Sequence, residues 1–165
     1  GFYSGISILS NALYYVAFLL IWVILPEIQI NNSAVNRRVL GTGYKLLGLM
    51  AAVAITGELI IKNKIAQILL GSGFSNQGNI LIFATLYQLT LVAITLYGFY
   101  LLVNRRRHAL LLAILVSSSS IVIPYLFANS PLEMIQLLWV SLLIGSALYV
   151  CIYGLYNIKR IMMSR

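Results

Sequence analysis

Long apolar segments alternate with short polar or basic stretches along the whole sequence. The apolar segments cover residues 4–28, 44–61, 80–103, 109–127 and 132–158. A run of about 20 apolar residues is long enough to cross the hydrocarbon core of a bilayer as an α-helix. These runs are too long for strands, and they lack the alternation typical of a membrane barrel. The pattern therefore predicts an all-α integral membrane bundle of about five transmembrane helices.

The composition agrees with this fold class and excludes a water-soluble domain. Hydrophobic residues make up 61% of the 165 residues and charged residues 8%, whereas soluble domains carry roughly 25% charged residues. In a soluble protein a net charge of +8 would suggest a nucleic-acid ligand. Here the basic residues lie between apolar runs, so we expect contact with the lipid bilayer and no nucleic-acid partner.

Lysine and arginine are divided unequally between the two predicted sides of the membrane. Cytoplasmic loops carry an excess of these residues, which predicts a multi-pass protein of the cytoplasmic membrane with a cytoplasmic C-terminus and Gly1 outside. An outer N-terminus without a signal sequence suggests that further helices of the same chain precede this segment. Only Lys62 and Lys64 fall on the outer side. The basic residues on the inner side are Arg37, Arg38, Lys45, Arg105, Arg106, Arg107, Lys159, Arg160 and Arg165.

Polar residues in the first predicted span share one face of the helix. Ser7, Asn11 and Tyr14 are spaced at i, i+4 and i+7, which places them above one another. An asparagine facing lipid is unfavourable, whereas one facing a bundle or a wet cavity finds partners. The two interpretations are a cavity that binds a polar, sugar-like cargo, and interhelical hydrogen bonding worth about 0.6 kcal/mol per pair. The candidate cavity-lining residues in the first and third spans are Ser7, Asn11, Tyr14, Gln88 and Thr95.

Glu58 is the only acidic residue embedded in a predicted span. It is a candidate for proton or ion coupling. The alternative is an interfacial residue near the outer side of the membrane, paired with Lys62 at i+4.

Small residues in the last two spans predict close helix packing. Residues 117–120 are four serines, and Ser141 with Gly145 forms a pair of small residues one turn apart. Such residues let helix backbones approach closely in a membrane.

The sequence contains no catalytic constellation. One His, no Asp and three separated Glu residues leave no acid–base pair or triad. The single cysteine, Cys151, and the single histidine, His108, cannot form a zinc site by themselves. We therefore expect no enzymatic activity, no metal site and no cofactor.

Three segments combine a hydrophobic pattern with small residues at fixed places. They are GFYSG at residues 1–5 with the span ending in LPEI, IAQILLGSGFSNQGNILIFATLYQL from Ile65, and NRRRHALLLAILVSSSSIVIPYLF from Asn104. Together they make the chain similar to the polysaccharide flippases of the multidrug/oligosaccharidyl-lipid/polysaccharide exporter superfamily. The resemblance implies that the chain corresponds to helices eight to twelve of a two-lobed exporter. Helix eight would run from outside to inside, as the charge distribution also predicts.

The resemblance further implies alternating access and a lipid-linked oligosaccharide as the substrate, carried across the cytoplasmic membrane in polysaccharide or lipopolysaccharide biosynthesis. Such families often place cations in the cavity to bind the pyrophosphate. No Lys or Arg lies mid-membrane here, so that role would fall to the missing N-terminal helices or to Arg37 or Arg38. Two alternatives stay open: another secondary transporter such as a drug/cation antiporter, and a non-transporting membrane assembly subunit.

Overall fold

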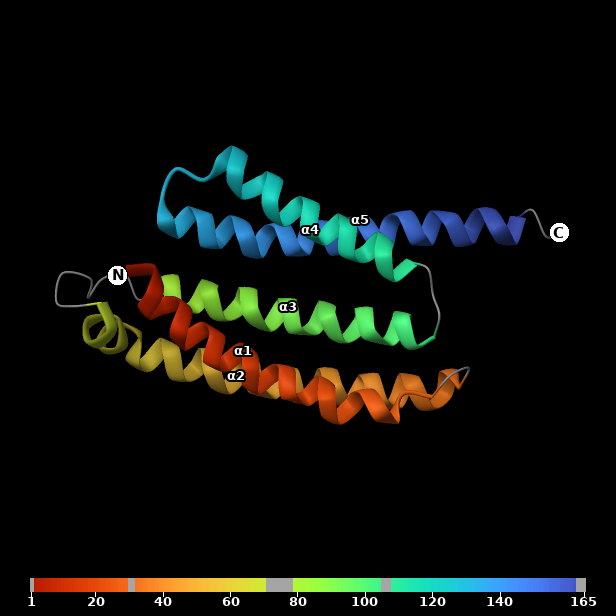
Figure 1. The fold of residues 1–165 in the computed structure, drawn as a ribbon, viewed down its shortest axis with the longest axis horizontal. Coiled ribbons are helices and arrows are strands. Elements are labelled where there is room, and N and C mark those ends of the chain that lie inside the picture. Colours follow the sequence, from red (N-terminus) through yellow and green to blue (C-terminus); the bar gives the residue numbers. More distant parts are fainter. Residues whose placement is uncertain (1, 30–31, 71–78, 105–107, 163–165) are drawn as a thin grey trace.

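The computed structural model describes residues 2–29, 32–70, 79–104 and 108–162. These residues form five α-helices and one short 3-10 helix, which confirms the all-α fold class (Figure 1). The predicted outer loop at 71–78 and the basic loop at 105–107 lie outside the described residues. The elements are α1 (Phe2–Ile24), η1 (Leu25–Glu27), α2 (Ser33–Leu70), α3 (Asn79–Val103), α4 (His108–Phe127) and α5 (Pro131–Met162).

Helices α2 to α5 each contain a segment long and apolar enough to cross a bilayer. These segments are Ala34–Ile61, Asn79–Val103, His108–Phe127 and Leu132–Tyr153. In the first predicted span, the part whose side chains the structure describes contains the apolar segment Asn11–Glu27, which is shorter. Of the five spans expected from the sequence, four are thus supported by helix length and hydropathy.

The exposed surface of the helices is apolar. Large side chains such as Ile60, Ile68 and Tyr125 are 77%, 81% and 87% exposed. In each of the four apolar segments only 11% to 39% of the residues are buried inside the bundle. Soluble monomers rarely expose contiguous apolar patches larger than a few hundred Å², whereas hydrocarbon is the natural surrounding of such a surface. The chain is therefore a multi-pass membrane protein.

Local hydrogen bonds determine where several helices begin and end. Helix α2 starts well before the apolar segment at residue 44, because the side chain of Asn32 accepts a hydrogen bond from the backbone of Val35 and caps the helix. At the start of α5, Ser130 Oγ accepts a bond from the Glu133 amide, and the Glu133 carboxylate accepts one from the Asn129 amide. The Ser130 bond is that of a capping box, whereas the Glu133 carboxylate bonds the amide one residue before the N-cap.

Helix α3 lies between two groups of helices and packs against both (Figure 1). On one side, Val92 and Leu96, which are 0% and 1% exposed, pack with α1 and α2. On the other side, Leu101 packs with α4 and α5 around Leu142 and Tyr149. Apolar cores therefore lie on both sides of α3. A third, smaller core joins the N-terminal part of α3 to that of α5 and consists of Ile80, Leu81 and Ala84 with Leu132 and Ile135.

The contact between α4 and α5 is built from small residues. Ser119 Oγ donates to the backbone oxygen of Ser141 at 2.8 Å, and Ser141 is fully buried. A Cβ added at Gly145 would lie 2.8 Å from Val116 Cα and 3.0 Å from the backbone oxygen of Leu115. The prediction that Ser141 and Gly145 form a contact surface is confirmed.

The C-terminal ends of α1 and α3 lie at the same end of the bundle (Figure 1). Asn36, which is 1% exposed, joins them there. Its side chain bonds both backbone groups of Gln29, at 2.7 and 2.9 Å, and donates to Asn104 Oδ1 at 3.5 Å. Arg37 and Arg38 follow directly in sequence and are exposed. This end corresponds to the one that the charge distribution predicts to be cytoplasmic.

Gly145→Ala should destabilise the protein although alanine is the better helix former. The propensity gain is about 1 kcal/mol, but overpacking against backbone atoms costs roughly 1–3 kcal/mol and cannot be relieved by a rotamer change. At Gly48 no atom lies within 4 Å of the added Cβ, so Gly48→Ala should raise the melting temperature. Thermal unfolding in detergent measures both variants, and equal shifts would contradict the packing of α4 on α5.

Single-cysteine labelling tests the orientation. With Cys151 replaced by Ala, we expect an impermeant thiol reagent added outside intact cells to label Asn129→Cys and not Arg37→Cys. Both positions are exposed and lie at opposite ends of the bundle. After the membrane is permeabilised, both should react, which controls for accessibility. Labelling of Arg37→Cys alone in intact cells would reverse the orientation.

Candidate functional site

Two polar contacts attach α1 and α2 to the same level of α3. Thr85 Oγ1 on α3 donates to Glu58 Oε1 on α2 at 2.5 Å. Gln88 Nε2 on α3 donates to Asn11 Oδ1 on α1 at 3.1 Å. Thr85 and Gln88 are three residues apart, so they are neighbours on the helix surface. We call Asn11, Glu58, Thr85 and Gln88 the polar seam.

Glu58 is buried in this seam. Its side chain is 9% exposed and that of its partner Thr85 is 2% exposed. Glu58 Oε2 has no hydrogen-bond partner among the described residues, although a buried polar atom left unsatisfied costs about 1–3 kcal/mol. The side chain of Lys62, the partner in the interfacial interpretation, lies outside the described residues. The carboxyl group is thus held against α3.

A groove between α1 and α2 borders the other side of Glu58. Its volume is about 360 Å³, and it runs along Ala12, Leu13 and Val16 of α1. Every other residue that lines it is apolar, so Glu58 is the only ionisable group there. An ionisable side chain inside a membrane bundle is a functional candidate by default, because its burial is otherwise unfavourable.

Asn11 and Gln88 are the two sequence candidates that the structure brings together. Asn11 is half-buried, and its bond to Gln88 joins residues 77 positions apart. This contact is of the interhelical kind, the second of the two interpretations of the polar stripe. Gln88 supplies the donor and Asn11 the acceptor, and hydrocarbon could satisfy neither group.

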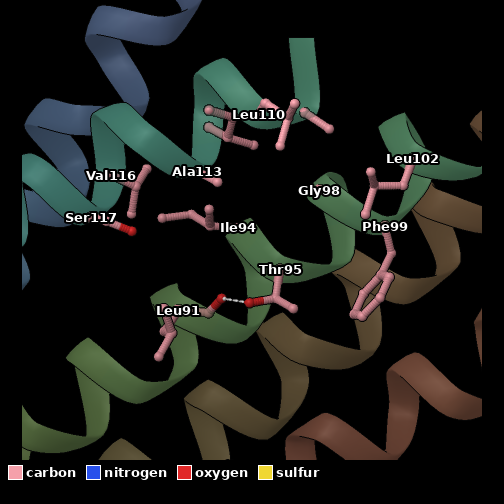
Figure 2. A pocket seen from close by; sticks show the side chains of 12 residues that line it. Leu91, Ile94, Thr95, Gly98, Phe99, Leu102, Leu110, Ala113, Val116 and Ser117 are labelled. Carbon is pink, nitrogen blue, oxygen red and sulfur yellow. Dashed lines mark hydrogen bonds between the residues drawn. The ribbon is translucent and has the colours of Figure 1, made fainter. Parts of the chain in front are cut away.

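The other candidates lie elsewhere. Tyr14 stacks on Phe18 with ring centroids 5.4 Å apart, within the apolar core of α1, α2 and α3. Thr95 Oγ1 donates to the backbone oxygen of Leu91 in its own helix at 2.7 Å (Figure 2). Ser7 belongs to α1, but its side chain is outside the described residues. Tyr14 and Thr95 thus take part in contacts other than the bond between Asn11 and Gln88.

Sequence reasoning missed Thr85. The signal was its position three residues before Gln88, which puts a hydroxyl and an amide on adjacent turns of one helix. It also missed the bond from Trp139 Nε1 on α5 to Thr90 Oγ1 on α3 at 3.1 Å. The hydrophobic pattern counts a tryptophan in a span as an apolar residue. Only the packing of α5 on α3 shows that its N–H group donates to Thr90.

No family model, curated protein or solved structure matches this chain. The similarity to polysaccharide flippases therefore remains a prediction. The classification as a multi-pass membrane protein stands on the length and hydropathy of the helices and on their apolar surface.

Thr85→Val should lower the free energy of unfolding by about 1–3 kcal/mol, because Glu58 then loses its donor inside the bundle. Adding Glu58→Leu should restore part of this loss, since removing both polar partners can be nearly neutral. Thr42→Val is the matched control: its hydroxyl bonds only its own helix at an exposed position, so the change should stay within about 0.5 kcal/mol. Unfolding in mixed micelles measures the wild type, Thr85→Val, Glu58→Leu, the double variant and Thr42→Val. Additive effects of Thr85→Val and Glu58→Leu would show that the two residues are not coupled.

Proposed function

We propose that this chain is the C-terminal part of a membrane transporter that moves lipid-linked oligosaccharide units across the cytoplasmic membrane by alternating access. The observation that carries the proposal is the polar seam. It supplies a carboxyl group, a hydroxyl and two amides between three apolar helices at one level.

The chemistry of the seam suits a polar cargo. Amide side chains both donate and accept hydrogen bonds, and hydroxyl groups do the same, which is what sugar hydroxyls require. Interhelical hydrogen bonds in membranes average only about 0.6 kcal/mol. The bonds from α3 to α1 and α2 are therefore weak enough to be exchanged for bonds to a cargo when these helices separate.

The cargo class rests on the sequence resemblance together with the location of the exposed arginines. Arg37 and Arg38 are exposed at the end of the bundle that we assign to the cytoplasm. A lipid-linked oligosaccharide made on the inner leaflet has a pyrophosphate at that level, and guanidinium groups bind phosphate well. In the proposed transporter, further helices of the same chain would form the opposite lobe of the transport path.

The buried carboxyl group favours one alternative, a cation-coupled antiporter of drugs or ions. Glu58 is the only ionisable residue in the α1–α2 groove, and one of its oxygens lacks a partner in the described structure. A carboxyl group in this setting can bind a proton or a cation. A buried carboxyl group is compatible with a flippase for lipid-linked oligosaccharides and with an antiporter of drugs or ions. The experiment must therefore distinguish these two functions.

Export of polysaccharide by a flippase-deficient strain tests the proposal. The strain carries the full-length protein with Asn11→Leu, or with Tyr15→Leu as the control on an exposed side of α1. We expect Asn11→Leu to reduce export per folded molecule about fivefold, the factor that roughly 1 kcal/mol of lost binding corresponds to. Tyr15→Leu should export normally.

Two outcomes would contradict the flippase proposal. If Asn11→Leu lowers the amount of folded protein and leaves export per molecule unchanged, Asn11 serves packing alone. If the unaltered full-length protein fails to restore export but drives proton-dependent efflux of a cationic dye, and Glu58→Gln abolishes that efflux, the antiporter alternative is correct.

A further inference from the structure

The two carboxyl oxygens of Glu58 differ in their contacts. Oε1 accepts a hydrogen bond from Thr85, whereas Oε2 is buried and has no partner among the described residues. Glu58 lies in the apolar segment Ala34–Ile61 of α2, so hydrocarbon surrounds the bundle at this level. An ionised carboxylate that is buried without a partner is far more unfavourable than the neutral acid. Oε2 therefore requires either a positive charge beside it or a proton on it.

The two helices that border Glu58 supply no positive charge. Neither α1 nor α3 contains a lysine, an arginine, a histidine or an acidic residue. The α1 residues that line the groove beside Glu58 are apolar. The titratable side chains of the two helices are all tyrosines, which cannot pair with a carboxylate as cations. These are Tyr3, Tyr14 and Tyr15 on α1 and Tyr87, Tyr97 and Tyr100 on α3.

On α2 itself, two lysines follow Glu58. Lys64 is exposed, and the side chain of Lys62 lies outside the described residues. Both follow Ile61, the last residue of the apolar segment, where a lysine side chain can extend to the membrane surface. An ion pair with Lys62 is the alternative that an experiment has to distinguish from a bound proton.

A proton is the cation that this site accommodates best. Metal ions are held by several oxygen ligands at once, about six to eight in the case of calcium. Glu58 is the only residue of the groove lining with a polar side chain, and its Oε2 is buried. A proton needs no second ligand, because it bonds to Oε2 itself. We propose that Glu58 is a proton-binding site and that Oε2 carries a proton while α1, α2 and α3 are packed as in this structure.

The groove between α1 and α2 gives this proton a short path to water. Gly57 and Ile61 line the groove together with Glu58. Ile61 ends the apolar segment, and Glu58 lies three residues before it, about 4.5 Å along the helix. The proton can therefore exchange with water when the helices that form the groove separate. Only the consequence for transport rests on the proposed function: separation of these helices during alternating access would release the proton.

Infrared difference spectroscopy of the full-length protein in lipid at neutral pH tests for the proton. The carbonyl stretch of a protonated carboxyl group lies at a higher frequency than the bands of a carboxylate. We expect Glu58→Gln to remove one band from the region of protonated carboxyl groups. Glu133→Gln is the matched control at an exposed position on α5, and it should leave that region unchanged. Thr85→Val should move the Glu58 band to higher frequency, since Oε1 loses its donor, and it serves as a second variant should Glu58→Gln not fold.

Transfer into D₂O tests the path of the proton. Deuterium replaces the acid proton and lowers the frequency of the Glu58 band. Ala12→Leu fills the groove from α1 and should slow this change about fivefold or more, the factor that corresponds to roughly 1 kcal/mol. Gly48→Leu is the control, because Gly48 is exposed on α2 and has no atom within 4 Å of its added Cβ, and it should exchange as the wild type does. Exchange that is not slower in Ala12→Leu would reject the groove as the path.

The spectra separate the proton site from its alternatives. If Glu58→Gln removes carboxylate bands and leaves the region of protonated carboxyl groups unchanged, the proton site is overturned. If a protonated band then appears in Lys62→Met, the ion pair with Lys62 is correct. Because the spectra require no cargo, a protonated Glu58 in a protein that does not restore polysaccharide export would reject the flippase and retain the proton site.

Discussion

The structure depends on the burial of α3 between the other helices. A helix that is apolar all round has no side that must face water, so it can contact neighbours on both flanks. Val92 and Leu96 are fully buried against α1 and α2, and Leu101 is buried against α4 and α5. Because dispersion and close packing hold helices together in lipid, the two halves of the bundle are joined mainly through this one helix.

The two flanks of α3 differ in chemistry. Toward α1 and α2 it presents Thr85 and Gln88, which bond Glu58 and Asn11. Toward α4 it leaves an apolar groove beside Gly98. Hydrocarbon penalises an unpaired polar group much more than a missing contact between apolar side chains. Thr85 and Gln88 on α3 are accordingly both bonded, whereas packing is open on the apolar flank beside Gly98.

The α4–α5 hairpin follows a different rule from the polar seam. Gly145 and Ser141 let the two backbones approach until the Ser119 hydroxyl reaches a backbone oxygen. Small residues at one-turn spacing were readable in the sequence, because the spacing alone puts them on one face. The sequence did not show which helix would pack against these residues, because small residues that allow a close approach do not select a particular neighbour.

The sequence by itself determined the all-α fold, the membrane environment and most helix positions, since these follow from runs of apolar residues and from the need to satisfy backbone groups in lipid. The caps at Asn32 and Ser130 refine them. Only the tertiary structure decided that Glu58 bonds Thr85 and that Asn11 bonds Gln88. Periodicity relates residues within one helix, whereas the rotation and depth of each helix against its neighbours arise from packing between segments far apart in the chain.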